Sequence, residues 1–241
     1  MDNTRQSFTH ALFHLAANPR YIQPLREEVE AITKEEGWSK AALGKMRKID
    51  SFLRECQRVE GFSSGMCLYI RSMSHLLRFF NPLVGLLRKT LKDFTFSDST
   101  FVPKGTVIVT PMRSIHHDKT FYENAHAFEP FRFADLHEED GADVRYQFTS
   151  TTTEYLPFGH GRYAWYGLSF SLFPITIEIH RLYVSPGRFF AASELKSMLA
   201  HVVVMYDVKL ADNSTRPRTL HFATVLMPDP NAEVMFRRRA D

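Results

Sequence analysis

The period of the apolar residues changes near residue 90 of this 241-residue chain, and this change constrains the fold more than any other feature. Before it, three segments carry apolar residues at the three- and four-residue spacing of amphipathic helices: Thr4 to Ala17, Tyr21 to Glu36 and Met46 to Val59. Asn18-Pro19 ends the first segment and Gly37 closes the second. The first part of the chain is therefore predicted to be helical.

Strand patterns follow in the second part. Thr106 to Thr110 is a β-branched run typical of a strand, and Phe94 to Phe96 precedes a turn. Asp207 to Phe236 is predicted to form short strands, whereas Phe189 to Met205 has the pattern of another amphipathic helix. Phe121 to Tyr155 shows no clear period, which indicates a long irregular segment of the kind that is usually functional or specially packed. The expected fold class is mainly α with small β-sheets (α+β).

Charge and cysteine content exclude several classes of protein. Thirty basic against 27 acidic residues give a net charge of +3, which offers no electrostatic case for nucleic acid; the closing Arg237 to Arg239 is interpreted as a solvated tail. Cys56 and Cys67 do not make a disulfide framework, so a reducing compartment is expected. No signal peptide is expected, because the first residues do not show a positively charged start followed by an apolar core. The longest apolar stretch, Gly167 to Ile179, is shorter than the ~20 residues of a membrane-spanning helix, so no membrane segment is expected.

One helix carries a spaced pair of opposite charges. Glu55 and Arg58 lie three residues apart, which places both side chains on one face of the helix. On its own this spacing is more commonly a solvated ion pair. About seventy residues later stands Phe128-Glu-Pro-Phe-Arg-Phe133, whose Arg132 supplies a further charge in a mostly aromatic setting.

Two glycine-containing segments resemble the halves of one loop. Residues 155–164 read Tyr-Leu-Pro-Phe-Gly-His-Gly-Arg-Tyr-Ala, and 186–192 read Pro-Gly-Arg-Phe-Phe-Ala-Ala. Joined by a cysteine they give the haem-binding loop of the cytochrome P-450 monooxygenases, in which the cysteine thiolate is the axial ligand of haem iron. The two charged motifs, this loop and the helix after it follow one another in an order that resembles that family. Further short segments of the sequence are similar to those of fungal secondary-metabolite oxidases. The resemblance implies a single partial domain over 1–241, the C-terminal portion of the cytochrome P-450 fold, without the N-terminal half and membrane anchor.

The resemblance also implies roles for particular residues. Arg132 would join Glu55 and Arg58 in a buried hydrogen-bonded cluster. In the loop, the cofactor-binding residues would be Phe158 packing near the cysteine sulfur, Gly161 and Gly187 permitting a tight path, and Tyr163 at the position that contacts a haem propionate, with Arg162 adjacent. An acid and a threonine relay protons to dioxygen in the family. Asp2 aligns with the acid and Thr4 falls just after the threonine position, which is occupied by Asn3 and thus departs from the pattern.

The expected cofactor and partners follow from the same resemblance. Haem, an iron protoporphyrin, would insert one atom of dioxygen into an apolar small-molecule substrate, with electrons from an NADPH-dependent reductase. Members of the family are usually anchored to the endoplasmic reticulum membrane, but nothing in this chain determines its location. The substrate is not readable, because the residues that shape the pocket lie mostly upstream.

The axial cysteine is missing: its slot falls between Ala164 and Pro186, so no metal ligand is assigned. The codon of Trp165 is TGG, that of Tyr166 is TAY and that of Ser185 can be AGY. With these codons an intron begins with GT, at the third base of the Trp165 codon, and ends with the AG of the Ser185 codon. Its removal joins the TG of the Trp165 codon to the pyrimidine (Y) of the Ser185 codon, which gives a cysteine codon in frame. Residues 166–185 are therefore interpreted as a translated retained intron; the alternative is a genuine surface insertion, which gives no reason for the codons to restore cysteine.

A second segment, 65–84, allows the same interpretation. Gly65 to Cys67 can be encoded with the donor sequence GTATGT, and Leu83-Val84 can contain an acceptor AG. Excision would join Ser64 to Gly85 through a valine.

The chain is accordingly predicted to resemble a haem-dependent monooxygenase but to be inactive in its present sequence, because the ligand cysteine is missing. The main alternative is a non-catalytic fragment, or mis-spliced gene product, that binds no haem. An unrelated α+β interaction domain is a third hypothesis, but it leaves four ordered motifs unexplained. His160 is chemically able to ligate iron, although nothing in the sequence positions it, and Cys56 is expected on a core helix.

Overall fold

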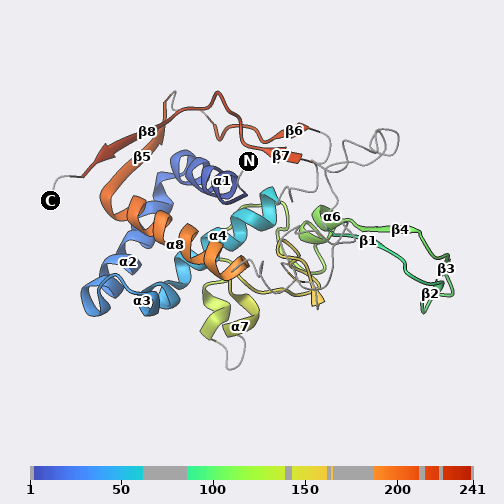
Figure 1. Ribbon diagram of the computed structural model, residues 1–241. Helices are drawn as coiled ribbons and strands as arrows, with labels where there is room; N and C mark the ends of the chain where they lie inside the picture. The colour runs from blue at the N-terminus through green and yellow to red at the C-terminus, as the bar shows by residue number, and fades with distance from the viewer. Residues whose placement is uncertain are drawn as a thin grey trace, which may run out of the picture.

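A computed structural model describes residues 3–61, 86–138, 143–161, 164, 187–211, 215–222 and 225–239 (Figure 1). Both segments interpreted as retained introns, 65–84 and 166–185, lie outside the described residues.

The helical first part has the predicted order. It consists of α1 (Asn3–Ala17), the 3-10 helix η1 (Pro19–Tyr21), α2 (Ile22–Glu36), α3 (Lys40–Lys45) and α4 (Arg47–Glu60). Pro19 stands at the first position of η1, where its missing N–H costs nothing. Gly37 ends α2 with a positive φ of 65° while its N–H donates to the Thr33 carbonyl. The short helix α3 was not predicted; the Ser39 hydroxyl caps it by accepting from the Ala42 N–H at 3.1 Å.

The second part contains small antiparallel sheets and further helices. Among the described residues each sheet has two strands, and the pairs are β1 with β4, β2 with β3, β5 with β8 and β6 with β7. The bounds are β1 (Leu86–Lys89), β2 (Phe94–Thr95), β3 (Phe101–Val102), β4 (Val107–Thr110), α6 (Met112–His116), η2 (Asp135–Glu138), α7 (Asp143–Tyr146), α8 (Gly187–Met205), β5 (Tyr206–Leu210), β6 (Leu220–Phe222), β7 (Val225–Met227) and β8 (Val234–Arg238). The prediction of a mainly helical α+β fold with small sheets is confirmed.

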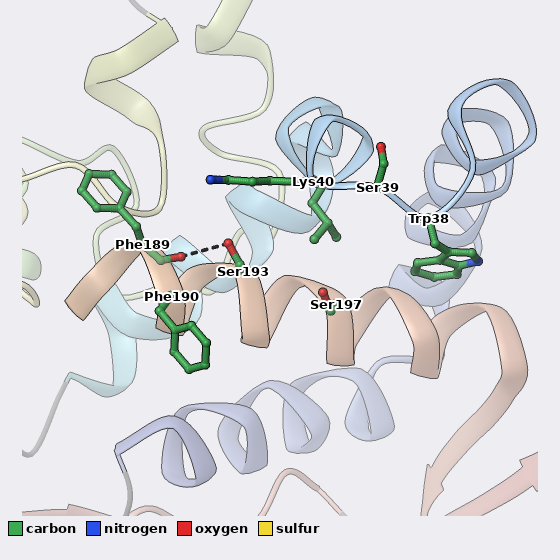
Figure 2. A pocket seen from close by; sticks show the side chains of 8 residues that line it. Trp38, Ser39, Lys40, Phe189, Phe190, Ser193 and Ser197 are labelled. Carbon is green, nitrogen blue, oxygen red and sulfur yellow. Dashed lines mark hydrogen bonds between the residues drawn. The ribbon is translucent and has the colours of Figure 1, made fainter. Parts of the chain in front are cut away.

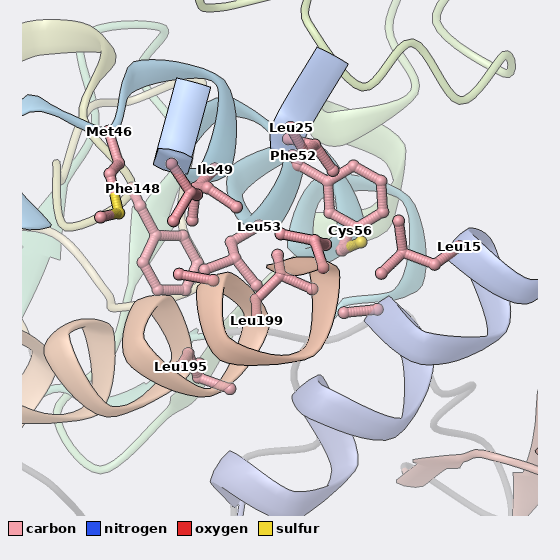
Figure 3. Close-up of a cluster of buried hydrophobic side chains, with 14 of the residues drawn as sticks. Leu15, Leu25, Met46, Ile49, Phe52, Leu53, Cys56, Phe148, Leu195 and Leu199 are labelled. Carbon is pink, nitrogen blue, oxygen red and sulfur yellow. The ribbon is translucent and has the colours of Figure 1, made fainter. Parts of the chain in front are cut away.

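Helix α4 lies at the centre of the fold, in contact with α1, α2, α6 and α8 (Figure 1). The paired ribbon of β1 and β4, with β2 and β3 at its tip, extends away from these helices. Most residues of α4 are buried, including the charged side chains of Asp50, Arg54, Glu55, Arg58 and Glu60. Apolar side chains from α1, α2, α4 and α8 meet in one core (Figure 3), which includes Leu15, Leu25, Ile49, Phe52, Leu53, Leu195 and Leu199.

Helix α2 supplies charged groups to the ends of two other helices. The Glu28 carboxylate accepts hydrogen bonds from the N–H groups of Lys48 (2.7 Å) and Ile49 (3.0 Å) in the first turn of α4. The Arg26 guanidinium donates to the Val203 carbonyl (2.7 Å) in the last turn of α8. A carboxylate at a helix N-terminus and a cation at a C-terminus both match the polarity of the helix dipole. These bonds therefore fix α4 and α8 relative to α2.

A second tie joins α4 directly to α8. The Lys196 ammonium lies 2.8 Å from one oxygen of Asp50, whose other oxygen accepts the Phe148 N–H at 2.6 Å. Both side chains of the ion pair are about nine-tenths buried. Burial without this mutual pairing would be costly, so α8 is held to the central helix at a defined position.

Among the residues that the structure describes, no helix is both long enough and apolar enough to span a membrane.

Candidate functional site

The guanidinium of Arg58 is the centre of a buried polar cluster at the end of α4. Its Nε and Nη2 donate to the two carboxylate oxygens of Glu55, each at 2.7 Å, and both side chains are completely buried. The remaining N–H groups donate to the carbonyls of His116 (2.6 Å), Ala125 (2.7 Å) and Ala127 (3.0 Å). All five donors of the arginine are thus used, which is how a guanidinium can be stable away from water.

Arg132 completes the cluster from the irregular segment. Its Nε donates to Glu55 at 3.2 Å, and the backbone N–H of Glu129 donates to the same oxygen at 3.0 Å. Its Nη groups reach the carbonyls of Glu123 and Asn124, and it also pairs with the Glu129 carboxylate at 3.1 Å. The structure therefore brings Glu55, Arg58 and Arg132 together, and with them it fixes the path of residues 123–132.

The cluster also holds the segment that leads into the predicted haem loop. Tyr155 is completely buried, and the guanidinium of Arg54 lies 4.0 Å above its ring. The Tyr122 hydroxyl donates to the Glu154 carbonyl at 2.8 Å. The Leu156 N–H donates to Nε2 of His116 at 3.0 Å. Side chains from α4, α6 and the irregular segment thus position 154–156 against the central helix.

Beyond Leu156 the backbone turns at glycines. The N–H of Gly159 donates to the Leu156 carbonyl at 2.9 Å, and that of Ala164 donates to the Gly161 carbonyl at 2.9 Å. Gly159 and Gly161 have φ values of 78° and 70°, a region that a side chain disfavours. Phe158 is buried and packs edge-on against Phe148, with ring centroids 5.3 Å apart. This geometry is a tight, glycine-dependent loop on a rigid support.

Comparison with known proteins identifies the family of this chain. A family model described as cytochrome P-450 matches residues 71–178. Cytochrome P-450 monooxygenase 151 of Postia placenta is 43% identical over 233 residues, covering 97% of this chain and 39% of that protein. Cytochrome P-450 monooxygenase janQ of Penicillium janthinellum is 33% identical over 239 residues, covering 99% of this chain and 40% of that protein. The chain belongs to the cytochrome P-450 family.

This partial cytochrome P-450 spans 39% and 40% of the lengths of those two fungal relatives. The helices and small sheets described above are the α+β C-terminal portion of the cytochrome P-450 fold. The family-model match begins and ends within the two segments interpreted as retained introns.

Of the other predicted site residues, some lie among the described residues and some do not. Thr4 lies half-buried in the first turn of α1, whereas Asp2 lies outside the described residues. Arg162 and Tyr163 also lie outside them. Gly187 begins α8 with a φ of 56°. The structure thus brings Phe158 and Gly161 onto one supported loop, whereas Thr4 lies on α1.

The described residues do not supply the thiolate that a cytochrome P-450 haem requires. The cysteine among the described residues is Cys56 of α4, and its side chain is buried in the core that α4 forms with α1 and α8. Burial raises the pKa of the Cys56 thiol well above its usual value, so the thiolate form that binds metal is disfavoured. Across the described ranges, no three His, Cys, Asp or Glu side chains gather to hold a metal ion. Cys67 lies outside them.

The histidine beside the loop is also poorly suited to replace a cysteine. His160 is exposed, and its Nδ1 lies 3.2 Å from the Thr151 carbonyl. This contact holds the ring within its own loop. The residues in place therefore fit the scaffold of a haem loop but not its metal ligand.

A surface hollow of about 600 Å³ lies between α3 and α8 (Figure 2). Its polar groups are few: the Ser193 hydroxyl already donates to the Phe189 carbonyl at 2.9 Å, and Lys40 is its titratable side chain. A binding site for a polar ligand would present several converging polar groups. We therefore take the Arg58 cluster and the loop that it supports as the candidate functional site. The hollow is lined by Trp38, Ser39, Lys40, Leu43, Phe189, Phe190, Ser193 and Ser197.

Sequence reasoning missed two supporting residues of this site. Arg54 is buried, with its guanidinium against the rings of Tyr155 and Phe133, and His116 joins α6 to the loop. Arg54 stands four residues before Arg58, on the same face of the helix, which was an available signal. Sequence reasoning assigned no role to His116, because its partners come from distant parts of the chain.

Proposed function

We propose that this chain is the haem-loop portion of a fungal cytochrome P-450 monooxygenase whose axial cysteine is interrupted by a translated intron. One observation carries the proposal. The Arg58 cluster and Tyr155 fix a glycine loop that reaches Ala164, immediately before the vacant cysteine slot. A rigid support of this kind is what a metal-ligand loop requires, since small displacements of a ligand weaken its site.

The loop residues are assigned their roles on the same basis. Phe158 and Phe148 would form the apolar packing beneath the cysteine sulfur, and Gly161 and Gly187 would allow the backbone to approach it closely. Burial in an apolar shell and hydrogen bonds from backbone amides tune the potential of a haem thiolate. Tyr163 and Arg162 would contact the haem propionates, as donors of a hydrogen bond and of a positive charge respectively.

The parent enzyme would oxidise apolar organic substrates with dioxygen. Haem supplies the oxygen chemistry when it is bound, and electrons would come from an NADPH-dependent reductase. Asp2 and Thr4 are proposed for proton delivery; Thr4 lies in the first turn of α1. Membership of the family supports two further proposals: that the parent enzyme is anchored at the endoplasmic reticulum membrane, and that 1–241 is one partial domain.

The chain as translated is proposed to be inactive, because Cys56 is buried in the core and the loop carries no thiolate. The second candidate is a non-catalytic fragment that binds no haem. The burial of Cys56 favours this candidate for the translated chain, while the intact loop support favours the monooxygenase for the spliced product.

Spectroscopy of engineered chains tests the proposal. In a chain extended upstream to full length, residues Trp165 to Ser185 are replaced by one cysteine. We expect the reduced protein with carbon monoxide to give a thiolate-type haem spectrum and to turn over substrate, because the thiolate donates the electron density that favours O–O cleavage.

Two matched controls accompany this variant. In the first control, Trp165 to Ser185 are replaced by one serine, which keeps the loop length of the variant but provides no thiolate. The second control is the extended chain without any replacement, which keeps both segments interpreted as introns. Neither control should show the thiolate spectrum or turnover. A thiolate spectrum in either control would overturn the assignment of the missing ligand to the interrupted loop.

A further inference from the structure

His116, the last residue of α6, uses both its backbone and its ring to connect two parts of the site. It is completely buried. Its carbonyl accepts from Nη1 of Arg58 at 2.6 Å, and its ring Nε2 accepts from the Leu156 N–H at 3.0 Å. One residue therefore joins the central arginine to the segment that leads into the loop.

The direction of the Leu156 bond fixes the state of the ring. A backbone amide can only donate, so Nε2 must carry a lone pair and the proton of the neutral ring must be on Nδ1. Nδ1 is buried and has no hydrogen-bond partner among the described residues. Burial and the nearby charge of Arg58 lower the pKa of His116 to about 3, so the ring stays neutral.

This arrangement leaves one donor unpaired in order to provide one acceptor. Buried polar groups are nearly always paired, and an exception in a folded protein needs an explanation. The acceptor satisfies the N–H of Leu156, which lies in a buried, irregular segment and has no strand or helix partner there. The Leu156 carbonyl in turn accepts from Gly159 and closes the turn that precedes Gly161.

The ring is also held rigidly. It lies nearly parallel to the ring of Tyr155, with centroids 5.8 Å apart, and Tyr155 itself lies above Arg54. The carbonyl of His116 cannot shift without breaking a 2.6 Å bond to Arg58, whose other donors are all in use. Any displacement of the Leu156 backbone is therefore opposed by the whole Arg58 cluster.

We propose that His116 is a positioning residue, which transmits the fixed geometry of the Arg58 cluster to the loop through the Nε2 acceptor. This inference rests on the proposed function in that the loop it positions is the one assigned to haem. It acts through Leu156 and touches no reacting atom.

Amide hydrogen exchange of the full 241-residue chain, without haem, tests this role. His116→Leu introduces an apolar side chain of similar bulk and removes the acceptor. His116→Gln places a carbonyl oxygen where Nε2 stands, whereas His116→Asn is shorter by one methylene and places its oxygen near Nδ1. We expect exchange at Leu156 to accelerate about tenfold or more in His116→Leu and His116→Asn, and to stay within about threefold of the original chain in His116→Gln.

Two results would overturn the proposal. One is unchanged protection of Leu156 in His116→Leu and His116→Asn. The other is a loss in His116→Gln as large as in His116→Asn, which would assign the imidazole a packing role instead.

A measurement on the unsubstituted chain does not depend on the folding of any variant. Labelling the histidine rings with ¹⁵N should reveal a neutral ring protonated at Nδ1, with a scalar coupling from Nε2 to the Leu156 amide nitrogen. A ring protonated at Nε2 would contradict the proposal. Since no haem takes part, these results stand apart from the spectroscopic test of the proposed function.

Discussion

At the scale of single residues, a buried neutral histidine makes the stability of the fold depend on pH. The pKa of His116 is lowered from 6.5 to about 3 by burial first, and then by the charges of Arg58, His117 and Arg54. Below pH 6.5 the unfolded chain binds a proton at this position that the folded chain does not, so folding becomes less favourable as the pH falls towards 3. Between pH 7 and pH 5 this one ring should reduce the free energy of unfolding by about 2 kcal/mol.

Urea denaturation of the chain and of His116→Gln at pH 7 and pH 5 measures this contribution. Glutamine does not titrate, so the loss of stability on acidification should be about 2 kcal/mol smaller in the variant. Burial also lowers the pKa of His10, to about 4, so part of the acid sensitivity should remain. An equal loss in both proteins would show that His116 is not held neutral.

At the scale of elements, one carboxylate of helix α2 holds the N-terminus of α4. Glu28 accepts from two N–H groups in the first turn of α4, a helix whose N-cap residue Met46 provides no side-chain bond. Removing this partner leaves both amides unsatisfied and removes a negative charge from the positive end of the helix dipole. Glu28→Ala should therefore reduce the free energy of unfolding by about 1–2 kcal/mol, as loss of a helix cap does.

The exchange of the Lys48 and Ile49 amides reports this effect locally. Both should exchange faster in Glu28→Ala, while amides in the last turn of α4 keep their protection longer. Glu35→Ala is the matched control, since Glu35 is an exposed residue of the same helix. If the two substitutions cost the same, the bonds from Glu28 would not stabilise α4.

At the scale of the whole molecule, the described fold is built on either side of the two segments interpreted as retained introns. β1 begins just after the first of them, and α8 begins just after the second. Each is in contact with the rest of the fold, β1 through its pairing with β4 and α8 through the core. We expect a chain without the segments to keep these elements and to have a continuous loop before α8.

Sequencing of the mature transcript tests this interpretation directly. Spliced messages should join Ala164 to Pro186 through a cysteine codon and Ser64 to Gly85 through a valine codon. The genomic sequence should carry GT and AG at the ends of both segments. Transcripts that are uniformly unspliced at both places would refute it and favour genuine surface insertions.

Sequence pattern alone predicted the main helices to within a residue or two. The apolar spacing of α1, α2, α4 and α8 depends on neighbours three and four residues away, so it is visible locally. The strand β4 was recognised from its β-branched run for the same reason. The short helices α3 and α6 were not predicted, because segments of five or six residues are too short for a period to be recognised.

For the candidate site, too, features that depend on nearby residues could be predicted from the sequence, and features that depend on distant residues could not. The sequence by itself determined which residue types are present, that Glu55 and Arg58 share a helix face, and that the loop carries no cysteine. The tertiary structure decided how those charges are satisfied. Arg58 donates to carbonyls 58, 67 and 69 residues away, and the Leu156 N–H finds its acceptor 40 residues away in His116. Backbone carbonyls are chemically alike at every position, so no sequence pattern identifies the few that the fold brings to one guanidinium.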